Sequence, residues 1–228
     1  MEKFTNIAGG AFLPYVAKEI EKRKKFLEES NTKRENKHLI YLNNKNSWFR
    51  LTSCTNVSEL HPLFRKYNLS GDALAKKYIL QGGTVQGELN KQNEYQGITN
   101  RSGVGENGLY AMLPTRPLGY KPVPGIVSLD LSSAGRLGTL QYAAIRFICY
   151  DIEQLELMDA LYMKLGFTLV LEWGHTIFLG ENNNLEKPHP LNVFQHNTKE
   201  SLIKSIQKKR VSHSGNYDAM VGTVSNFG

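Results

Sequence analysis

The stretch from residue 119 to residue 173 constrains the fold of this chain more than any other part of the sequence. It contains an alternating run at Ile126–Ser132, a turn with two glycines at Ser133–Gly138, and a longer run at Thr139–Cys149 that is rich in β-branched and aromatic residues. Alternation and residues of these types are typical of strands. The sequence therefore predicts two strands that are joined by a short turn.

A helix and a third strand complete this stretch. Asp151 can cap the helix, Gln154 follows three residues later as in a capping box, and Gly166 ends the helix. The residues expected to face the core follow a 3.6-residue period: Ile152, Leu155, Met158, Leu161, Tyr162 and Leu165. Phe167–Trp173 alternates again and carries apolar residues on both faces, which predicts a well-buried strand. Thr176–Leu179 is expected to be its hairpin partner.

Residues 1–45 are predicted to form an N-terminal helical arm. Pro14–Ser30 has a thin apolar stripe among many charges, which is typical of an amphipathic helix that lies along a neighbour. A polar linker follows, and Ile40–Leu42 has the composition of a short strand. Ser47–Ser53 (SWFRLTS) alternates clearly and predicts the first strand of a main domain at residues 46–228.

The rest of the main domain combines a long loop with a helical insertion. Residues 81–108 are rich in Gly, Asn and Gln, and a loop of this length is expected to contact a partner or to be mobile. A helical insertion is expected at about residues 186–212, with Thr198 as its N-cap, and a last strand at Tyr217–Phe227. Because the sequence stops just after that strand without a polar tail, we expect the C-terminal part to be incomplete.

Composition excludes several classes of protein. The 228 residues carry a formal net charge of +7, and the dispersed charges indicate a solvated basic surface. Cys54 and Cys149 are the only cysteines, too few for a disulfide framework, which favours a reducing compartment. The N-terminus lacks the apolar run of a signal peptide, and no apolar run approaches the roughly 18 residues of a membrane span.

No motif in the sequence predicts a catalytic, cofactor-binding or metal-binding residue. Gly103–Gly108 matches G-x-G-x-x-G, but it lacks the preceding strand and following helix that a dinucleotide site requires. None of the six histidines pairs with another at helical spacing, so a metal site is not predicted. His175 and Glu172 could support acid–base chemistry, although no nucleophile accompanies them. The basic group Lys204, Lys208, Lys209 and Arg210 is expected to be a solvated helix end.

The segments PVPGIVSLDL and YDIEQLELMDALYMKLGFTLVLEWGH resemble tail structural proteins of bacteriophages, specifically baseplate-hub proteins whose tube-forming domain derives from the tail-tube β-barrel. In that family an early strand pairs with a longer one, a helix packs on the barrel, and a strand with an EWG-like turn follows. These parts correspond to Ile126–Ser132, Thr139–Tyr150, Asp151–Leu165 and Phe167–Gly174, and the resemblance covers most of residues 10–180.

The resemblance implies an α+β fold: a β-barrel or sandwich of the tail-tube type with a packed helix, plus the N-terminal helix and the long interface loop. It also implies a non-enzymatic virion protein that forms a homo-oligomeric ring, a trimer, through β-strand and arm contacts. The implied partners are other phage tail and baseplate proteins, with DNA passing through the lumen without specific binding. Such a protein assembles in the cytoplasm of the bacterial host, without membrane insertion.

Two other hypotheses stay open from the sequence. One is a neck or head–tail connector protein of a tailed phage, which differs in its position next to the portal. The other is a small lytic or nucleotide-using enzyme attached to the tail, whose activity would depend on His175 or Glu172.

Overall fold

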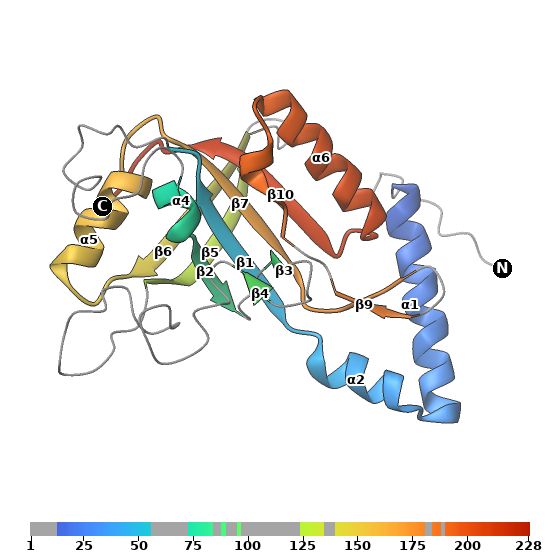
Figure 1. The fold of residues 1–228 in the computed structure, drawn as a ribbon. Coiled ribbons are helices and arrows are strands. Elements are labelled where there is room, and N and C mark those ends of the chain that lie inside the picture. The colour runs from blue at the N-terminus through green and yellow to red at the C-terminus, as the bar shows by residue number, and fades with distance from the viewer. Residues whose placement is uncertain are drawn as a thin grey trace.

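A four-stranded antiparallel sheet with the order β10-β7-β1-β2 forms the centre of the molecule (Figure 1). Its strands are β1 (Ser47–Ser53), β2 (Leu80–Gly83), β7 (Thr168–His175) and β10 (Tyr217–Thr223). The computed structural model describes residues 13–55, 73–83, 88–89, 95–96, 124–134, 140–180, 184–187 and 190–228. Strands β1 and β7 confirm the strands predicted at 47–53 and 167–173. Strand β10 is shorter than the strand predicted at 217–227.

The pairing of β7 corrects one prediction. Both edges of β7 are occupied, one by β1 and the other by β10. The chain that follows β7 therefore has no free edge to pair with, and the Thr176 amide instead donates to the Asn46 carbonyl at 2.8 Å. The predicted hairpin of Thr176–Leu179 with β7 is wrong: β8 (Phe178–Leu179) pairs with β9 (Leu185–Glu186).

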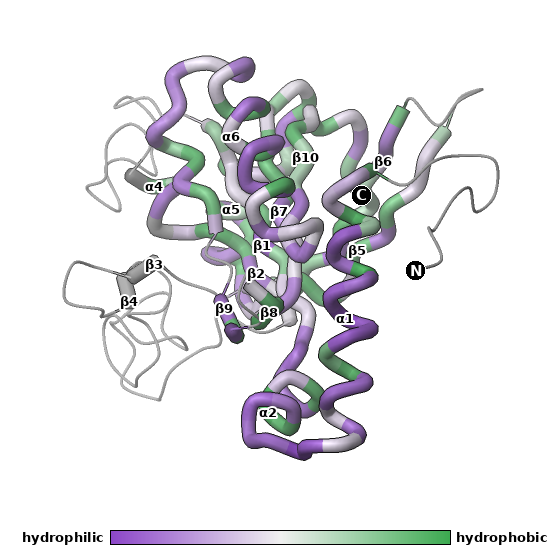
Figure 2. The backbone as a smooth tube through the Cα atoms, turned by 90° about the vertical axis from the view of Figure 1, so that its right-hand side faces the viewer, coloured by the Kyte–Doolittle hydropathy of each residue, from purple (hydrophilic) through white to green (hydrophobic). Residues whose placement is uncertain are grey.

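The two strands predicted at 126–132 and 139–149 are confirmed as β5 (Gly125–Ala134) and β6 (Leu140–Ile148). They form an antiparallel hairpin with one irregularity between Ile126 and Ser128. The base of this hairpin packs into the larger core, which also contains Leu51 and Leu171 from the sheet. Figure 2 shows the hairpin on one side of the sheet, so the two sheets form separate layers.

Helix α5 (Ile152–Tyr162) closes one end of this core. Its N-cap is confirmed, because the Asp151 carboxylate accepts from the Gln154 amide at 2.8 Å. The Gln154 side chain in turn accepts from the Tyr150 amide at 2.7 Å, one residue earlier than a standard capping box requires. This bond holds Gln154 inside the molecule and thereby sets the rotation of the helix.

The predicted core face of α5 is therefore half wrong. Met158, Leu161 and Tyr162 are buried as expected, but Ile152, Leu155 and Leu165 are exposed. Their places in the core are taken by other residues of the same helix: Gln154, Leu157 and Ala160. Both stripes share Met158 and Leu161, so the apolar period alone could not distinguish them.

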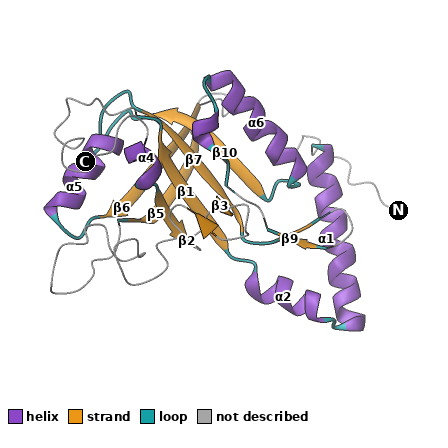
Figure 3. Cartoon of the chain, viewed as in Figure 1, coloured by secondary structure: helices purple, strands orange, loops and turns teal. Residues whose placement is uncertain are grey.

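The other helices lie around the sheets (Figure 3). Helix α6 (Lys199–Ser212), capped by Thr198 as predicted, packs Leu202 and Ile206 onto the second face of the sheet, beside Trp48 and Tyr217. The short elements are α4 (Ala73–Lys77), β3 (Glu88–Leu89), β4 (Tyr95–Gln96) and η2 (Val193–Gln195). Of the loop predicted at 81–108, residues 81–83 belong to β2, β3 pairs with β4, and the rest lies outside the described residues.

The N-terminal arm consists of two helices, α1 (Pro14–Lys33) and α2 (Asn36–Asn44). The strand-like character predicted for Ile40–Leu42 is wrong, because this segment lies within α2. The Glu35 amide donates to His38 Nδ1 at 3.1 Å and caps the helix, while Tyr41 packs edge-on against Phe26 of α1. This cap and this contact favour a helix over a strand.

The fold is α+β with antiparallel sheets, as predicted at that level, and the described strands do not close into a barrel. The arm lies at one end of the molecule and α5 at the other (Figure 1). Among the described residues, no helix combines the length and apolarity that crossing a membrane requires.

The rotation of α5 leads to a stability prediction. Leu161 is 0% exposed, so Leu161→Ala is expected to lower the free energy of unfolding by about 2–5 kcal/mol. Leu155 is 42% exposed, so Leu155→Ala is expected to cost less than about 1 kcal/mol. Urea unfolding of dilute protein, followed by circular dichroism, measures both values. Equal losses at the two positions would show that the helix has the rotation predicted by the apolar period.

Candidate assembly interface

The carboxylate of Glu172 lies at the centre of a buried hydrogen-bond network. Its Oε2 accepts from Arg50 Nε at 2.9 Å, and its Oε1 accepts from the Tyr217 hydroxyl at 2.9 Å and from the Leu191 amide at 2.6 Å. Arg50 also donates to the Leu191 carbonyl at 2.8 Å. Burial and the Glu172 carboxylate raise the pKa of the Tyr217 hydroxyl, so this hydroxyl stays a donor. The network joins β1, β7, β10 and the segment before α6.

The structure does not bring His175 and Glu172 together as an acid–base pair. They are three residues apart on β7, and side chains at odd spacing on a strand point to opposite faces. Both oxygens of Glu172 are also engaged in the network, whereas His175 lies at the end of the strand near the arm. The geometry gives Glu172 a structural role.

The other residues considered from the sequence are distributed over the molecule. In the part of the chain that is described, no group of three His, Cys, Asp or Glu side chains could hold a metal ion. Cys54 and Cys149 are free thiols, and burial raises the pKa of each. In the basic group, Lys209 lies 4.7 Å from the centre of the Tyr217 ring and Arg210 pairs with Asp218. The motif at Gly103–Gly108 lies outside the described residues.

The arm is attached to the sheets through a polar joint. Glu19 of α1 is buried, and its Oε1 accepts from Asn216 Nδ2 at 2.9 Å and from Arg23 Nε at 2.8 Å. Arg23 also donates to Asn216 Oδ1 at 2.5 Å, and Lys22 donates to the Leu179 carbonyl at 2.5 Å. Sequence reasoning missed this joint, whose one signal is an acidic residue on the apolar stripe of α1.

An aromatic contact and two titratable groups complete the joint. Phe26 packs with Tyr41, Ile177 and Leu179 in a small separate core. Burial, with the neighbouring cations Lys45 and Arg23, lowers the pKa of His175, and Glu19 acts in the opposite direction. Burial also lowers the pKa of Lys45 from 10.5 to about 8, together with the charge of Arg23. The joint therefore holds more positive charge than its single buried carboxylate balances.

The distal half of the β5–β6 hairpin extends beyond the core. Ile126, Leu129, Ile145 and Phe147, at its base, contribute to the core. Beyond them and Ala143, which also packs against the core, the hairpin tip (residues 131–134 and 140–142) carries three large apolar side chains: Leu131 (47% exposed), Leu140 (57%) and Tyr142 (51%). Leu131 is paired with Ala143 and Tyr142 with Ser132, so Leu131 and Tyr142 lie on opposite faces of the hairpin. Leu131 and Tyr142 are each about half exposed, so the described residues cover neither face of the tip completely.

A cleft of about 1020 Å³ lies between this hairpin and the sheet. Its wall is formed by β6, by the inner face of the sheet at Leu51, Leu169 and Leu171, by the start of α5, and by residues 222–228. Among the described strands, β6 pairs only with β5, and β10 only with β7. The cleft thus lies between two strand edges whose backbone groups are available to an additional strand.

Comparison of the chain with protein-family models, with curated proteins and with solved structures found no match. The surfaces that could support a function must therefore be judged on their own geometry. The hairpin tip exposes large apolar side chains, and β6 and β10 are edge strands of the described sheets, so these elements form the candidate assembly interface.

Because of the buried network, replacing Arg50 is expected to destabilise the protein much more than replacing Arg210. Arg50→Met leaves the Glu172 carboxylate buried without its cation, and it is expected to lower the free energy of unfolding by about 3–5 kcal/mol. Arg210→Met removes an ion pair with Asp218 that is partly exposed, and it is expected to cost about 0–1 kcal/mol. Chemical denaturation at pH 7 measures both. A similar cost for the two variants would contradict the central role of the network.

The polar joint predicts that the stability of the protein increases with pH. His175 has a lower pKa in the folded chain than in the unfolded chain, so the unfolded chain binds more protons below about pH 7 and stability falls toward pH 5. The lowered pKa of Lys45 also makes stability increase with pH, here between about pH 8 and pH 10.5. Urea midpoints measured from pH 5 to pH 7 are expected to fall less steeply with acidification in His175→Gln than in the wild type. His196→Gln is the control, and an unchanged slope in His175→Gln would refute the assignment.

Proposed function

We propose that this chain is a structural subunit of a bacteriophage virion, a tail-tube or baseplate-hub protein that forms a ring. The exposed hairpin tip is the main observation that supports this proposal. A protruding pair of long strands with apolar residues on both faces is a liability for an isolated protein, because it can pair or aggregate. The same feature is useful in a subunit whose neighbour covers it.

Two further observations support a ring built from β-strand contacts. The cleft lies between the edges of β6 and β10, so a strand from a neighbouring subunit could bridge them by β-augmentation. The resemblance of residues 119–175 to hub proteins suggests the tail-tube type of barrel, which in this proposal is completed between subunits. Three subunits are the expected ring order, with other tail and baseplate proteins as neighbours.

In this proposal the chain has no catalytic role, and its residues serve packing and assembly. The rigid unit is the sheet with α5 and α6: the Glu172 network joins the strands and the segment before α6, and α5 packs on the sheet through the larger core. The tip and the strand edges make the contacts between subunits, and DNA passes through the lumen without specific binding. Assembly takes place in the cytoplasm of the bacterial host.

The test is the oligomeric state of the purified protein and its variants. Wild-type protein is expected to form rings in negative-stain electron microscopy and in native mass spectrometry, alone or with its tail neighbours. The double variant Leu131→Ser/Tyr142→Ser is expected to stay monomeric, because it removes an apolar side chain from each face of the tip. Since these residues lie beyond the core, the variant is expected to unfold at nearly the wild-type urea concentration.

Val211→Ser is the matched control, because Val211 is a similarly exposed apolar residue on α6, away from the tip. It should leave ring formation unchanged. A wild-type chain that stays monomeric at all concentrations and joins no tail particle would refute the proposal. Rings located next to the portal in tail particles would instead identify a neck or head–tail connector protein.

A further inference from the structure

One face of α5 carries an apolar and acidic stripe that lies outside the core, and its residues Ile152 and Leu155 also line the cleft. Ile152, Leu155, Glu156 and Asp159 are spaced i, i+3, i+4 and i+7, so they share one face of the helix. Ile152 is 65% exposed, and Leu155 and Glu156 are also exposed. Asp159 pairs with Lys164 at the end of this face. Residues 151–165 hold four acidic residues and one lysine, in a chain that is basic as a whole.

The tip of the arm has the complementary character. Helix α2 buries His38 and Tyr41 but exposes three large apolar side chains: Leu39, Ile40 and Leu42. The turn into α2 adds the exposed cations Lys33 and Arg34, and Lys37, which pairs with Glu35. Residues 33–44 thus hold three cations and one acidic residue. We name this segment the arm tip.

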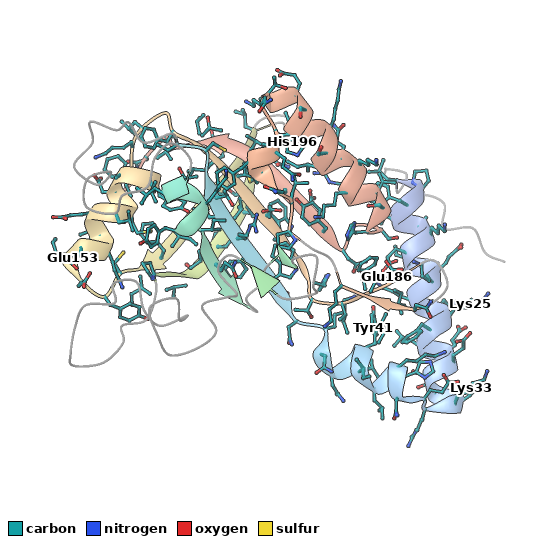
Figure 4. The ribbon with its side chains drawn as sticks, viewed as in Figure 1. Lys25, Lys33, Tyr41, Glu153, Glu186 and His196 are labelled. Atoms are coloured by element: carbon teal, nitrogen blue, oxygen red, sulfur yellow. The ribbon has the colours of Figure 1, made fainter. Side chains whose placement is uncertain are left out.

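These two surfaces lie at opposite ends of the molecule. Figure 4 shows Lys33 at the far end of the arm and Glu153 on α5 at the other end. The arm tip of one molecule therefore cannot cover α5 of the same molecule, but it can reach α5 of a neighbouring copy.

We propose that the arm tip of one copy docks on the apolar and acidic stripe of α5 of the next copy, head to tail. The occupant of the α5 face is thus a second copy of this chain. The argument is charge complementarity, because a basic apolar surface meets an acidic apolar one. The inference rests on the proposed ring function and names a contact of that ring outside the hairpin.

A contact between two different surfaces of identical chains is heterologous, and it closes into a ring when the rotation between neighbours divides a full turn. The apolar residues Leu39, Ile40 and Leu42 supply the buried centre of the contact. Lys33 and Arg34 lie against Glu156, where opposite charges fix the register and speed association. The arm then has two roles: α1 attaches to its own sheet, and α2 holds the neighbour.

Charge reversal tests the contact. Glu156→Lys and Lys33→Glu, each alone, are expected to weaken ring formation at least tenfold in protein concentration, because like charges then face each other. The double variant Lys33→Glu/Glu156→Lys in one chain is expected to recover most of the loss. Mass photometry over a concentration series gives the midpoint of assembly for each variant.

The matched controls carry the same charge changes elsewhere. Lys25 is exposed on α1 outside the arm tip, and Glu200 is exposed at the start of α6. Lys25→Glu and Glu200→Lys should leave the midpoint within twofold of the wild-type value. Their circular dichroism spectra and urea midpoints show whether any effect comes from unfolding.

Disulfide cross-linking supplies an independent readout of the same contact. In a background with Cys54→Ser and Cys149→Ser, a mixture of Ile40→Cys chains and Leu155→Cys chains is expected to form a covalent dimer upon oxidation. Each variant alone is expected to stay monomeric on a denaturing gel, because a head-to-tail contact does not bring like positions together.

The outcomes separate this inference from the proposed function. Rings that form normally in both charge-reversal variants would overturn the arm contact and leave the ring proposal intact. Such rings would assemble through other surfaces. A wild-type chain that forms no ring under any condition would overturn both.

Discussion

The pairing of β1 with β7 is the constraint on which the rest of the structure depends. Each of these strands is buried on both faces, so each contributes alternately to two cores. Leu51 and Leu171 face the hairpin and α5, whereas Trp48 and Val170 face α6. A change in this register by one residue would exchange the two sets of side chains between the two cores.

The Arg50–Glu172 pair secures that register from within. Arg50 and Glu172 lie directly opposite each other on the two strands. A buried carboxylate is tolerated only when its partners are in place, so any other register would leave Glu172 or Arg50 unpaired. Because Tyr217 and Leu191 also bind Glu172, the same interaction positions β10 and the segment that leads into α6.

Much of the fold could be predicted from the sequence where a local signal was complete. The alternation of Ser47–Ser53, the two runs of the hairpin, and the caps at Asp151 and Thr198 all correspond to observed elements. The errors arose where an interaction outside the apolar pattern decided the outcome. Gln154 rotated α5 through its bond to the Tyr150 amide, and the pairing of β7 on both edges left no place for residues 176–179.

The candidate interface was predictable only in part. The hairpin and the arm follow from local patterns, but the polar joint does not, because Glu19 and Asn216 are 197 residues apart in the sequence. The extent of the hairpin tip beyond the core was also hidden, since it depends on where the other elements end. An alternating run shows that a strand forms, and it does not show whether another chain covers it.

The large sequence separation between residues that bind each other has a consequence for biosynthesis. Arg50 must wait for a partner 122 residues later, and Glu19 for one 197 residues later, while synthesis proceeds at roughly 5–20 residues per second. The arm therefore leaves the ribosome roughly 10–40 seconds before Asn216, to which it binds. Until Tyr217 and Ala219 are made, the core between the sheet and α6 cannot close, and its apolar side chains stay accessible to a chaperone or to another copy of the chain.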